Sequence, residues 1–287
     1  MNYLNLGMTM SNYVIQTIGG MGNQLFQYAF AYSLAKRNNG EFFLDLTGFK
    51  DYKLRNFELN NFNLEYKPAP DELIDKLKVK KLFNKTFIKE KNSKYNKNFL
   101  KIKRDAYFRG FWQTEKYFKE YESDIKELFR FKNLNFIQNY ELLNEIKSSN
   151  SVSINVRLGD YVNDPTTAAI FHVCTQKYYR NAIEYIKQNV ENPRFFVYSD
   201  DLEGAKNYLP QDVEYTFCNG ASWQEDFYFM QNAKHAIIPN SSFAWWAAYL
   251  NPNPNKIILA PKNWFAKGAK QDYTNIVPQN WIKIENF

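Results

Sequence analysis

The sequence predicts an α/β protein of two lobes, each with a parallel sheet, and a ligand cleft between the lobes. Three observations support this fold class. The chain has 287 residues, more than the roughly 100–200 of one typical domain. Short apolar segments alternate with helical ones near both ends of the chain. The sequence also turns polar at residues 145–151, so we expect an N-terminal lobe at 11–149 and a C-terminal lobe at 150–287.

The first lobe opens with a strand, a glycine loop, a helix and a second strand. The strand is YVIQTI (13–18) and the loop is GGMGNQ (19–24). Apolar residues recur at near-helical spacing over 25–39, and EFFLDL (41–46) returns to a strand pattern. This order predicts a βαβ unit with a parallel sheet. Further along, the aromatic segment 105–113 predicts one more buried strand.

The second lobe repeats the alternation of strands and helices, with no internal repeat. Strands are expected where apolar runs are short, at 151–156, 194–199, 235–239 and 256–260. Helices are expected between them, at 176–189, 201–208, 223–233 and 242–250.

The composition is that of a globular protein that can bury a large core, with 45% hydrophobic residues, 25 Phe and 21 Tyr. Cys174 and Cys218 lack the spacing of a disulfide framework or a zinc site, and only His172 and His235 accompany them. We interpret both histidines as packing or hydrogen-bonding residues. A reducing, cytoplasmic setting fits best, and no stretch reaches the roughly 18 apolar residues of a membrane span.

Lysines are concentrated between Lys76 and Lys103, in a chain whose net charge is +7. Two interpretations stay open. The run is a solvated face, or it contacts an anionic membrane surface or nucleic acid. No nucleic-acid-binding motif supports the latter partner.

In open α/β sheets ligands bind outside the carboxyl ends of the strands, which directs attention to four strand–helix junctions. In the first, Gly20 and Gly22 allow close backbone approach, and the helix start beside Asn23 and Gln24 favours an anion such as pyrophosphate. A tight turn without a ligand is the alternative. Leu25 stands where the dinucleotide fingerprint needs its third glycine, which argues against an NAD-dependent enzyme.

The second junction follows strand 151–156 and contains Arg157 and Asp160. A guanidinium suits a bidentate grip on phosphate and stabilises charge on a departing phosphate. The alternative is an Arg157–Asp160 salt bridge that closes a turn. Both can hold together, since a carboxylate can orient the guanidinium.

The other two junctions each have a structural alternative. Asp200 and Asp201 suit a ribose, a sugar hydroxyl or a metal, but they also fit a helix cap, which we favour, without a metal. Ser241 and Ser242 are an N-cap or phosphate ligands. Asp226, in the apolar helix 223–233, is a satisfied core acid or the acceptor for the guanine N1–H and N2–H₂ groups.

Five motifs in order resemble the bacterial α-1,2-fucosyltransferases of glycosyltransferase family 11. They are GGMGNQLFQYAFAYSLA, YFRGFWQTEKYF, INVRLGDY followed by FHVC, FFVYSDD, and NSSFAWWAAYLNPNPNKIILAPKNWF. The resemblance implies a GT-B-like fold of two Rossmann-like lobes. It implies transfer of L-fucose from GDP-fucose to the 2-hydroxyl of a terminal β-galactoside in a bacterial surface glycan, with inversion and without an obligatory metal or other cofactor.

The resemblance also implies roles for single residues. The residues that would hold the GDP pyrophosphate are Arg157, Gly20, Gly22, Asn23, Gln24, Ser241 and Ser242. Asp226 would hold guanine, and Asp200 and Asp201 would support the donor. The first lobe would be the acceptor side. The partners would be GDP-fucose and a galactoside-terminated or lipid-linked glycan, in the cytoplasm or at the inner face of the inner membrane, by peripheral contact.

One motif departs from the family pattern His-x-Arg-Arg-x-Asp. Asn155 replaces the histidine and Leu158 the second arginine, while Arg157 and Asp160 remain. The expected catalytic set is therefore Arg157, Asp160 and Asn155, although Asn155 cannot act as a base. Asp160 is the nearest candidate base, with Asp164 and Glu225 as alternatives. The departure leaves open a GDP-sugar- or glycan-binding relative with weak or no transferase activity.

Overall fold

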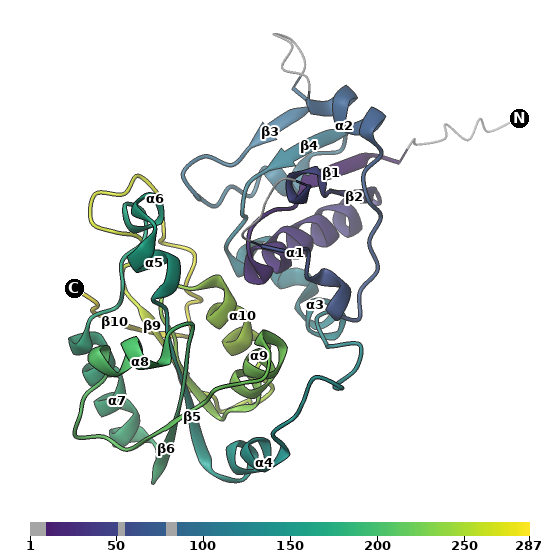
Figure 1. The fold of residues 1–287 in the computed structure, drawn as a ribbon. Coiled ribbons are helices and arrows are strands. Elements are labelled where there is room, and N and C mark those ends of the chain that lie inside the picture. Colours follow the sequence, from purple (N-terminus) through teal and green to yellow (C-terminus); the bar gives the residue numbers. More distant parts are fainter. Residues whose placement is uncertain (1–9, 51–54, 79–84) are drawn as a thin grey trace, which may run out of the picture. The chain divides into compact units, whose positions relative to one another are not determined.

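The computed structural model describes residues 10–50, 55–78 and 85–287. The chain forms two compact units that divide between Arg130 and Phe131 (Figure 1). This division is earlier than the expected 149/150, because helix α4 (Tyr140–Ser148) packs on elements of the second unit, β5 and α9. The polar turn at 145–151 therefore separates a helix from a strand within one unit.

The first unit contains a four-stranded parallel sheet with strand order β2-β1-β4-β3. Its strands are β1 (Asn12–Gln16), β2 (Glu41–Asp45), β3 (Phe87–Lys89) and β4 (Ala106–Arg109). Its helices are α1 (Met21–Asn38), α2 (Asp71–Lys78) and α3 (Glu122–Leu128), with short 3-10 turns at Thr47–Phe49, Leu59–Asn61, Phe99–Lys101, Glu115–Tyr117 and Lys119–Tyr121. The expected parallel βαβ unit is confirmed.

Helix α1 begins at Met21, four residues before the expected start. Gly20 is its N-cap, and the amides of Asn23 and Gln24 already bond to the Gly20 carbonyl at 2.9 and 3.2 Å. Most of the supposed glycine loop is thus the first helical turn. The helix ends where Asn39 adopts a left-handed φ of 50°.

The aromatic segment 105–113 is a strand only as far as Arg109. A turn through Gly110–Trp112 follows. The neighbouring strand β3 has three residues and was not expected, and it forms the edge of the sheet. Lys80 and Lys81 of the lysine-rich run lie outside the described residues.

The second unit contains a six-stranded parallel sheet with strand order β10-β9-β8-β5-β6-β7. The strands are β5 (Asn150–Val156), β6 (Pro193–Ser199), β7 (Tyr215–Phe217), β8 (His235–Ile237), β9 (Ile258–Pro261) and β10 (Ile282–Ile284). The helices besides α4 are α5 (Gly159–Asn163), α6 (Pro165–Ala168), α7 (Gln176–Asn189), α8 (Leu202–Ala205), α9 (Trp223–Asn232) and α10 (Ser242–Leu250). A 3-10 turn at Lys206–Tyr208 follows α8.

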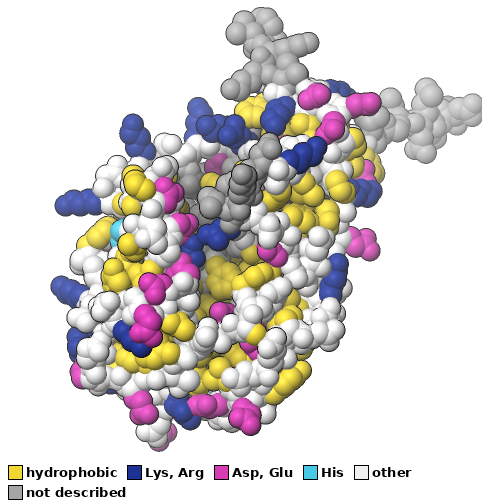
Figure 2. Space-filling model, viewed as in Figure 1, with side chains coloured by type: hydrophobic (Ala, Val, Ile, Leu, Met, Phe, Trp, Pro, Cys, Tyr) yellow, Lys and Arg dark blue, Asp and Glu magenta, His cyan; other side chains and the backbone are white. Residues whose placement is uncertain are grey.

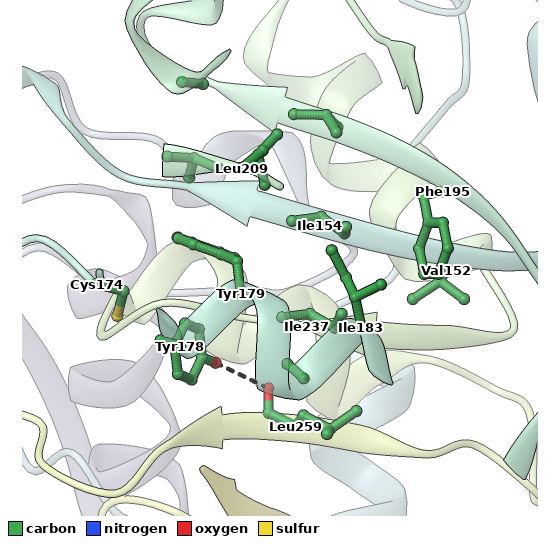
Figure 3. Close-up of a cluster of buried hydrophobic side chains, with 14 of the residues drawn as sticks. Val152, Ile154, Cys174, Tyr178, Tyr179, Ile183, Phe195, Leu209, Ile237 and Leu259 are labelled. Atoms are coloured by element: carbon green, nitrogen blue, oxygen red, sulfur yellow. Dashed lines mark hydrogen bonds between the residues drawn. The ribbon is translucent and has the colours of Figure 1, made fainter. Parts of the chain in front are cut away.

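Helix α7 covers one face of this sheet, and α9 and α10 cover the other (Figure 1). Alternate residues of β5, from Val152 to Val156, point into a core that also contains Tyr178, Tyr179 and Ile183 of α7 (Figure 3). The Tyr178 hydroxyl donates to the carbonyl of Ile238. This core fixes the position of the β5 carboxyl end.

No helix among the described residues is long and apolar enough to cross a membrane. Cys174 and Cys218 are both buried free thiols, and burial raises the pKa of each to about 12. Neither thiol therefore ionises readily.

Candidate functional site

Three of the four expected junctions lie at the carboxyl edge of one sheet, in the second unit. Strand β5 pairs with β6 on one side, up to Val156 and Ser199, and with β8 on the other. Residues 157–161 and 200–201 follow β5 and β6 directly, and residues 240–242 follow β8 after two intervening residues. Sheet pairing thus brings together residues that are distant in sequence.

Arg157 lies between two carboxylates at this edge. Its Nη1 contacts Oδ2 of Asp200 at 2.8 Å, and its Nη2 pairs with Asp160. Asp200 also accepts the backbone N–H of Leu158 at 2.9 Å. The guanidinium side chain is 23% exposed, so it is oriented but still reachable by a ligand. The salt bridge and the candidate phosphate site therefore coexist.

Gly159 is required for this arrangement. A Cβ at this position would lie 2.2 Å from Oδ2 of Asp200, much closer than real contacts allow. Any side chain would displace the carboxylate that orients Arg157. The glycine was not singled out from sequence, because its need depends on the β5–β6 pairing.

Tyr161 connects Arg157 to the fourth junction, after β8, and sequence reasoning missed it. The Arg157 guanidinium lies 5.6 Å from the centre of the Tyr161 ring, within cation–π range. The Tyr161 hydroxyl donates to the carbonyl of Asn240 at 2.7 Å. Burial raises the pKa of Tyr161 well above its usual value, so the hydroxyl stays protonated. The only signal in the sequence was an aromatic residue beside Asp160.

Helix α10 presents its N-terminus at the fourth junction. Ser241 is the N-cap residue, but its side chain makes no capping hydrogen bond. The first amides of a helix have no partner within it and favour an anion. The preceding Asn240 is buried and donates to the carbonyls of His172 and Trp264, at 3.1 and 2.9 Å. Asn240 therefore holds the turn that orients the first backbone amides of α10.

The two acids of the third junction, after β6, have different roles. Asp200 contacts Arg157, whereas the side chain of Asp201 accepts the N–H of Gly204 at 2.9 Å and caps α8. The favoured cap is thus confirmed for Asp201. Asp200 instead forms, with Arg157 and Asp160, a group that we call the arginine cluster. No group of three or more metal-ligating side chains occurs in the described parts of the chain.

Asp226 lies in the first turn of α9 with its Oδ1 buried and unpartnered. Burial raises the pKa of this carboxyl to about 7, and the neighbouring Glu225 adds to the rise. A hydrogen bond from the Gly220 backbone N–H partly offsets this rise in the pKa. Oδ1 itself has no hydrogen-bond partner, so Asp226 is not a fully satisfied core acid, one of its two interpretations from the sequence. A buried acceptor without a donor is a binding group in need of a ligand.

Glu225 and Asp164, the two alternative bases, have structural roles. The buried Glu225 carboxylate accepts the N–H groups of Gln138, Asn139 and Ala221 at 2.7–2.9 Å. Burial alone would raise its pKa, but these bonds outweigh it and lower the pKa. Asp164 caps α6, and its bond with the Thr167 hydroxyl at 2.6 Å lowers its pKa. Both are poorly suited to take a proton.

The two atypical residues of the arginine motif are both buried. Asn155 is 8% exposed and donates to the carbonyl of Tyr198 at 3.2 Å. Leu158 is 4% exposed and belongs to the core on the α7 face. The leucine at position 158 is therefore a packing residue in this chain. Its side chain adds nothing to the charged cluster around Arg157.

The expected residues of the first unit lie at the start of α1. Gln24 is fully buried, and its amide group donates to the carbonyls of Gly19 and Asn56, both at 2.8 Å. Its oxygen accepts the N–H of Glu58 at 2.8 Å. These bonds use both N–H groups of the amide, so Gln24 holds the turn and has no donor left for a ligand. Asn23 accepts from Gln113 at 2.8 Å.

Comparison with known proteins shows the family to which the chain belongs. The model of the family "Glycosyl transferase family 11" matches residues 5–285. An Escherichia coli alpha-1,2-colitosyltransferase is 35% identical over 96% of this chain and all of its own length. The E. coli O-antigen biosynthesis glycosyltransferase WbnK is 27% identical over 93% of this chain and 98% of its own.

Among solved structures, an arginine-to-lysine mutant of Arabidopsis thaliana FUT1 in complex with GDP is similar in fold. Its TM-score is 0.50 at 12% identity, with 89% of this chain and 72% of that chain covered. The two parallel-sheet units are Rossmann-like, and the fold class is GT-B-like, as expected. The chain belongs to glycosyltransferase family 11.

Proposed function

We propose that the chain is an inverting glycosyltransferase that moves L-fucose from GDP-fucose to the 2-hydroxyl of a terminal β-galactoside in a bacterial surface glycan. The observation that carries this proposal is Arg157, held between Asp160 and Asp200 at the carboxyl edge of a parallel sheet. Membership of the family supports the reaction class.

In this proposal the arginine cluster binds the departing diphosphate. As the bond between the sugar and the β-phosphate breaks, the sugar carbon becomes oxocarbenium-like and negative charge collects on the phosphate, by analogy with glycoside hydrolysis. Arg157 and the first amides of α10, beside Ser241 and Ser242, are donors that do not need to reorganise. They stabilise the leaving group more than the intact donor.

Asp160 is the proposed general base. Asp164 and Glu225 are committed to caps and backbone bonds, whereas Asp160 shares the guanidinium with Asp200. When Arg157 engages phosphate, Asp200 can keep the guanidinium oriented while Asp160 accepts the proton of the acceptor hydroxyl. Asn155 supports β6 through its bond to Tyr198 and transfers no proton.

Asp226 is the proposed guanine ligand. Its unpartnered Oδ1 can accept the N1–H or N2–H₂ group of guanine, which adenine and pyrimidines do not offer in this pattern. The start of α1, with the backbone of Gly20 and Gly22 and the side chain of Asn23, offers a further anion-binding position in the first unit. We also assign acceptor binding to that unit.

The reaction is proposed to need no metal, because Arg157 and a helix N-terminus supply the positive charge that a cation would otherwise provide. Addition of EDTA should leave the initial rate unchanged. If EDTA lowered the rate and Mg²⁺ restored it, the proposal that the reaction needs no metal would be refuted. The proposed location is the cytoplasmic face of the inner membrane, by peripheral contact.

A second donor is favoured by one specific observation. The relative that is 35% identical over 96% of this chain is named an alpha-1,2-colitosyltransferase. Colitose differs from L-fucose by the loss of one hydroxyl, so the same site can accept its GDP ester. A side-by-side measurement of kcat/KM with GDP-fucose and GDP-colitose distinguishes the two donors.

The central test is GDP release from GDP-fucose in the presence of lactose, with identification of a 2′-fucosylated product. Arg157→Ala should lower kcat/KM by roughly two orders of magnitude or more, the scale of losing one preorganised donor. Asp160→Asn should lower kcat with little change in donor KM. Turnover near the wild-type rate in Arg157→Ala would refute the assignment.

The atypical Asn155 and Leu158 motivate an alternative, a GDP-sugar-binding protein without transferase activity. The same assay separates the two functions. Tight binding of GDP-fucose with neither product nor donor hydrolysis would favour the binding protein. A melting temperature that rises with GDP but not with NAD would further exclude an NAD-dependent enzyme.

A further inference from the structure

The turn that follows β4 in the first unit has an unusual backbone. Trp112 adopts a φ of 57°, a left-handed conformation that is costly for a bulky residue. Its ring is fully buried and stacks on Phe30 with 4.2 Å between the ring centres. Packing therefore holds the strained residue in place. Strain of this kind persists where the surrounding structure needs a particular chain path.

Glu90, at the end of β3, fixes the same turn from the other side. Its Oε2 accepts the N–H groups of Phe111 and Trp112 at 2.8 and 3.2 Å. Its Oε1 is buried without a partner. Gly110 permits this contact, since a Cβ there would lie 2.5 Å from the Glu90 Cβ. Three neighbouring residues are thus specialised for one short turn.

The result of these constraints is the exposure of one aromatic ring. Phe111, between the glycine and the strained tryptophan, is 42% exposed. A single exposed apolar side chain is ordinary on a protein surface. Here, however, the residues on both sides of Phe111 are held in place, although this leaves Trp112 with a strained backbone and Glu90 with an unpaired Oε1. The next residue, Gln113, donates to Asn23 at 2.8 Å and connects the turn to the start of α1.

The turn also lies where a ligand is expected. It follows the carboxyl end of β4, which pairs with β1 and β3 in the first sheet. Ligands of parallel α/β sheets bind at this edge. A β-galactoside has one face made of C–H groups, and such faces pack on aromatic rings, while its hydroxyls need polar partners.

We propose that Phe111 is a stacking platform for a sugar ring of the acceptor, with Glu90 as its positioning residue. This inference rests on the proposed function and adds the residue that selects the acceptor. The ring contacts the sugar face, and Glu90 acts only through the backbone of Phe111 and Trp112. Stacking lowers the free energy of the bound acceptor and leaves donor chemistry unchanged.

The kinetic test compares Phe111→Ala, Phe111→Trp and a matched control, Tyr140→Ala, which removes an aromatic side chain that is 59% exposed in the second unit. Phe111→Ala should raise the KM for lactose about tenfold, while donor hydrolysis without acceptor and the Kd for GDP stay at wild-type values. Phe111→Trp should restore the KM. Glu90→Ala should raise the KM for lactose with little loss of kcat.

Saturation-transfer NMR with lactose and GDP tests the contact without requiring turnover. Wild-type protein and Tyr140→Ala should transfer saturation to the galactose C–H protons, and Phe111→Ala should not. Equal transfer in Phe111→Ala, or no transfer in the wild type, would overturn the platform. Failure of the proposed function is a separate outcome, since wild-type protein would then form no 2′-fucosylated product or would not bind GDP.

Discussion

At the scale of single residues, the site assigns different tasks to similar side chains. Asp200 contacts Arg157, while the adjacent Asp201 caps a helix. The pKa of Glu225 is lowered, whereas the pKa of the adjacent Asp226 is raised to about 7. In each pair the difference comes from the donors within reach. Glu225 accepts three backbone N–H groups, and Oδ1 of Asp226 accepts none.

The pKa of Asp226, raised to about 7, predicts that GDP binds more tightly as pH rises. In the protonated carboxyl one oxygen is a hydroxyl that donates, so only the ionised carboxylate of Asp226 offers both oxygens as acceptors to guanine. The ionised fraction grows about tenfold between pH 6 and pH 8, so the Kd for GDP should fall by about the same factor. Isothermal titration at the two pH values measures this change.

Asp226→Asn is the control, since ionisation of the phosphate persists in that variant. A pH dependence equal to that of the wild type would show that Asp226 does not contact guanine. The contribution of Asp226 to the free energy of unfolding changes with pH in the opposite direction to the affinity for GDP. Because the folded pKa lies above the unfolded one, the folded state binds the proton more tightly, and this contribution to stability is lost as pH rises from about 4 to about 7.

At the scale of elements, short helices at the strand ends position the functional groups. Helix α8 starts at the Asp201 cap immediately after Asp200, so its start determines where the Asp200 carboxylate lies. Helix α10 starts directly after the turn that Asn240 holds. The arginine cluster thus depends on two helix starts as well as on three strands.

The cap assignment predicts a separation of stability from binding. Asp201→Ala should lower the free energy of unfolding by about 1 kcal/mol, as for the loss of other N-caps, and should change the Kd for GDP little. Asp200→Ala should weaken GDP binding. Glu203→Ala, on the same helix and 84% exposed on its side chain, is the control for stability. Thermal unfolding and GDP titration of the three variants together check the assignment.

The predictability of these elements follows from their length and from the range of their contacts. Short apolar runs of about five or six residues, such as 151–156 and 235–239, predicted their strands. Strands β3, β7 and β10 have three residues each and lie in no such run, so they gave no signal. The Arg157–Asp160 pair was predictable because the residues are three apart. Contacts of Arg157 with Asp200, and of Tyr161 with Asn240, depend on sheet pairing, which local sequence does not encode.

At the scale of the whole molecule, positive charge is concentrated in the first unit. Residues 85–104, the basic strip, contain seven lysines and Arg104 against Glu90, a formal net charge of +7 that equals that of the entire chain. All eight basic side chains are exposed. Figure 2 shows Lys and Arg side chains gathered over the part of the first unit that contains β3 and α2. Edge-strand lysines also discourage aggregation, so a test must separate the two roles.

We expect the basic strip to bind anionic lipid surfaces in a salt-dependent manner. Each lysine near such a surface contributes about 1 kcal/mol, so changing Lys89, Lys91, Lys94 and Lys97 to Gln should weaken binding to phosphatidylglycerol vesicles by about 100-fold or more. Raising the salt from ~0.1 M to ~0.5 M should weaken wild-type binding as well. Co-sedimentation with anionic and with neutral vesicles measures both effects.

The matched control changes four exposed lysines of the second unit to Gln, namely Lys177, Lys267, Lys270 and Lys283. It removes the same net charge from another surface. Equal loss in both variants would mean that only total charge matters. Binding to RNA in preference to anionic vesicles would assign the strip to a nucleic-acid partner instead.

The strand order of the second sheet has a consequence for how this protein acquires its activity. Val152 pairs with His235, and Tyr161 bonds to Asn240, across about eighty intervening residues. Contacts this distant in sequence form late, because closing a long loop costs entropy before the new contacts can offset that cost. Nucleotide affinity should therefore appear only with the last cooperative step of refolding, and GDP can serve as a probe that distinguishes the finished unit from compact intermediates.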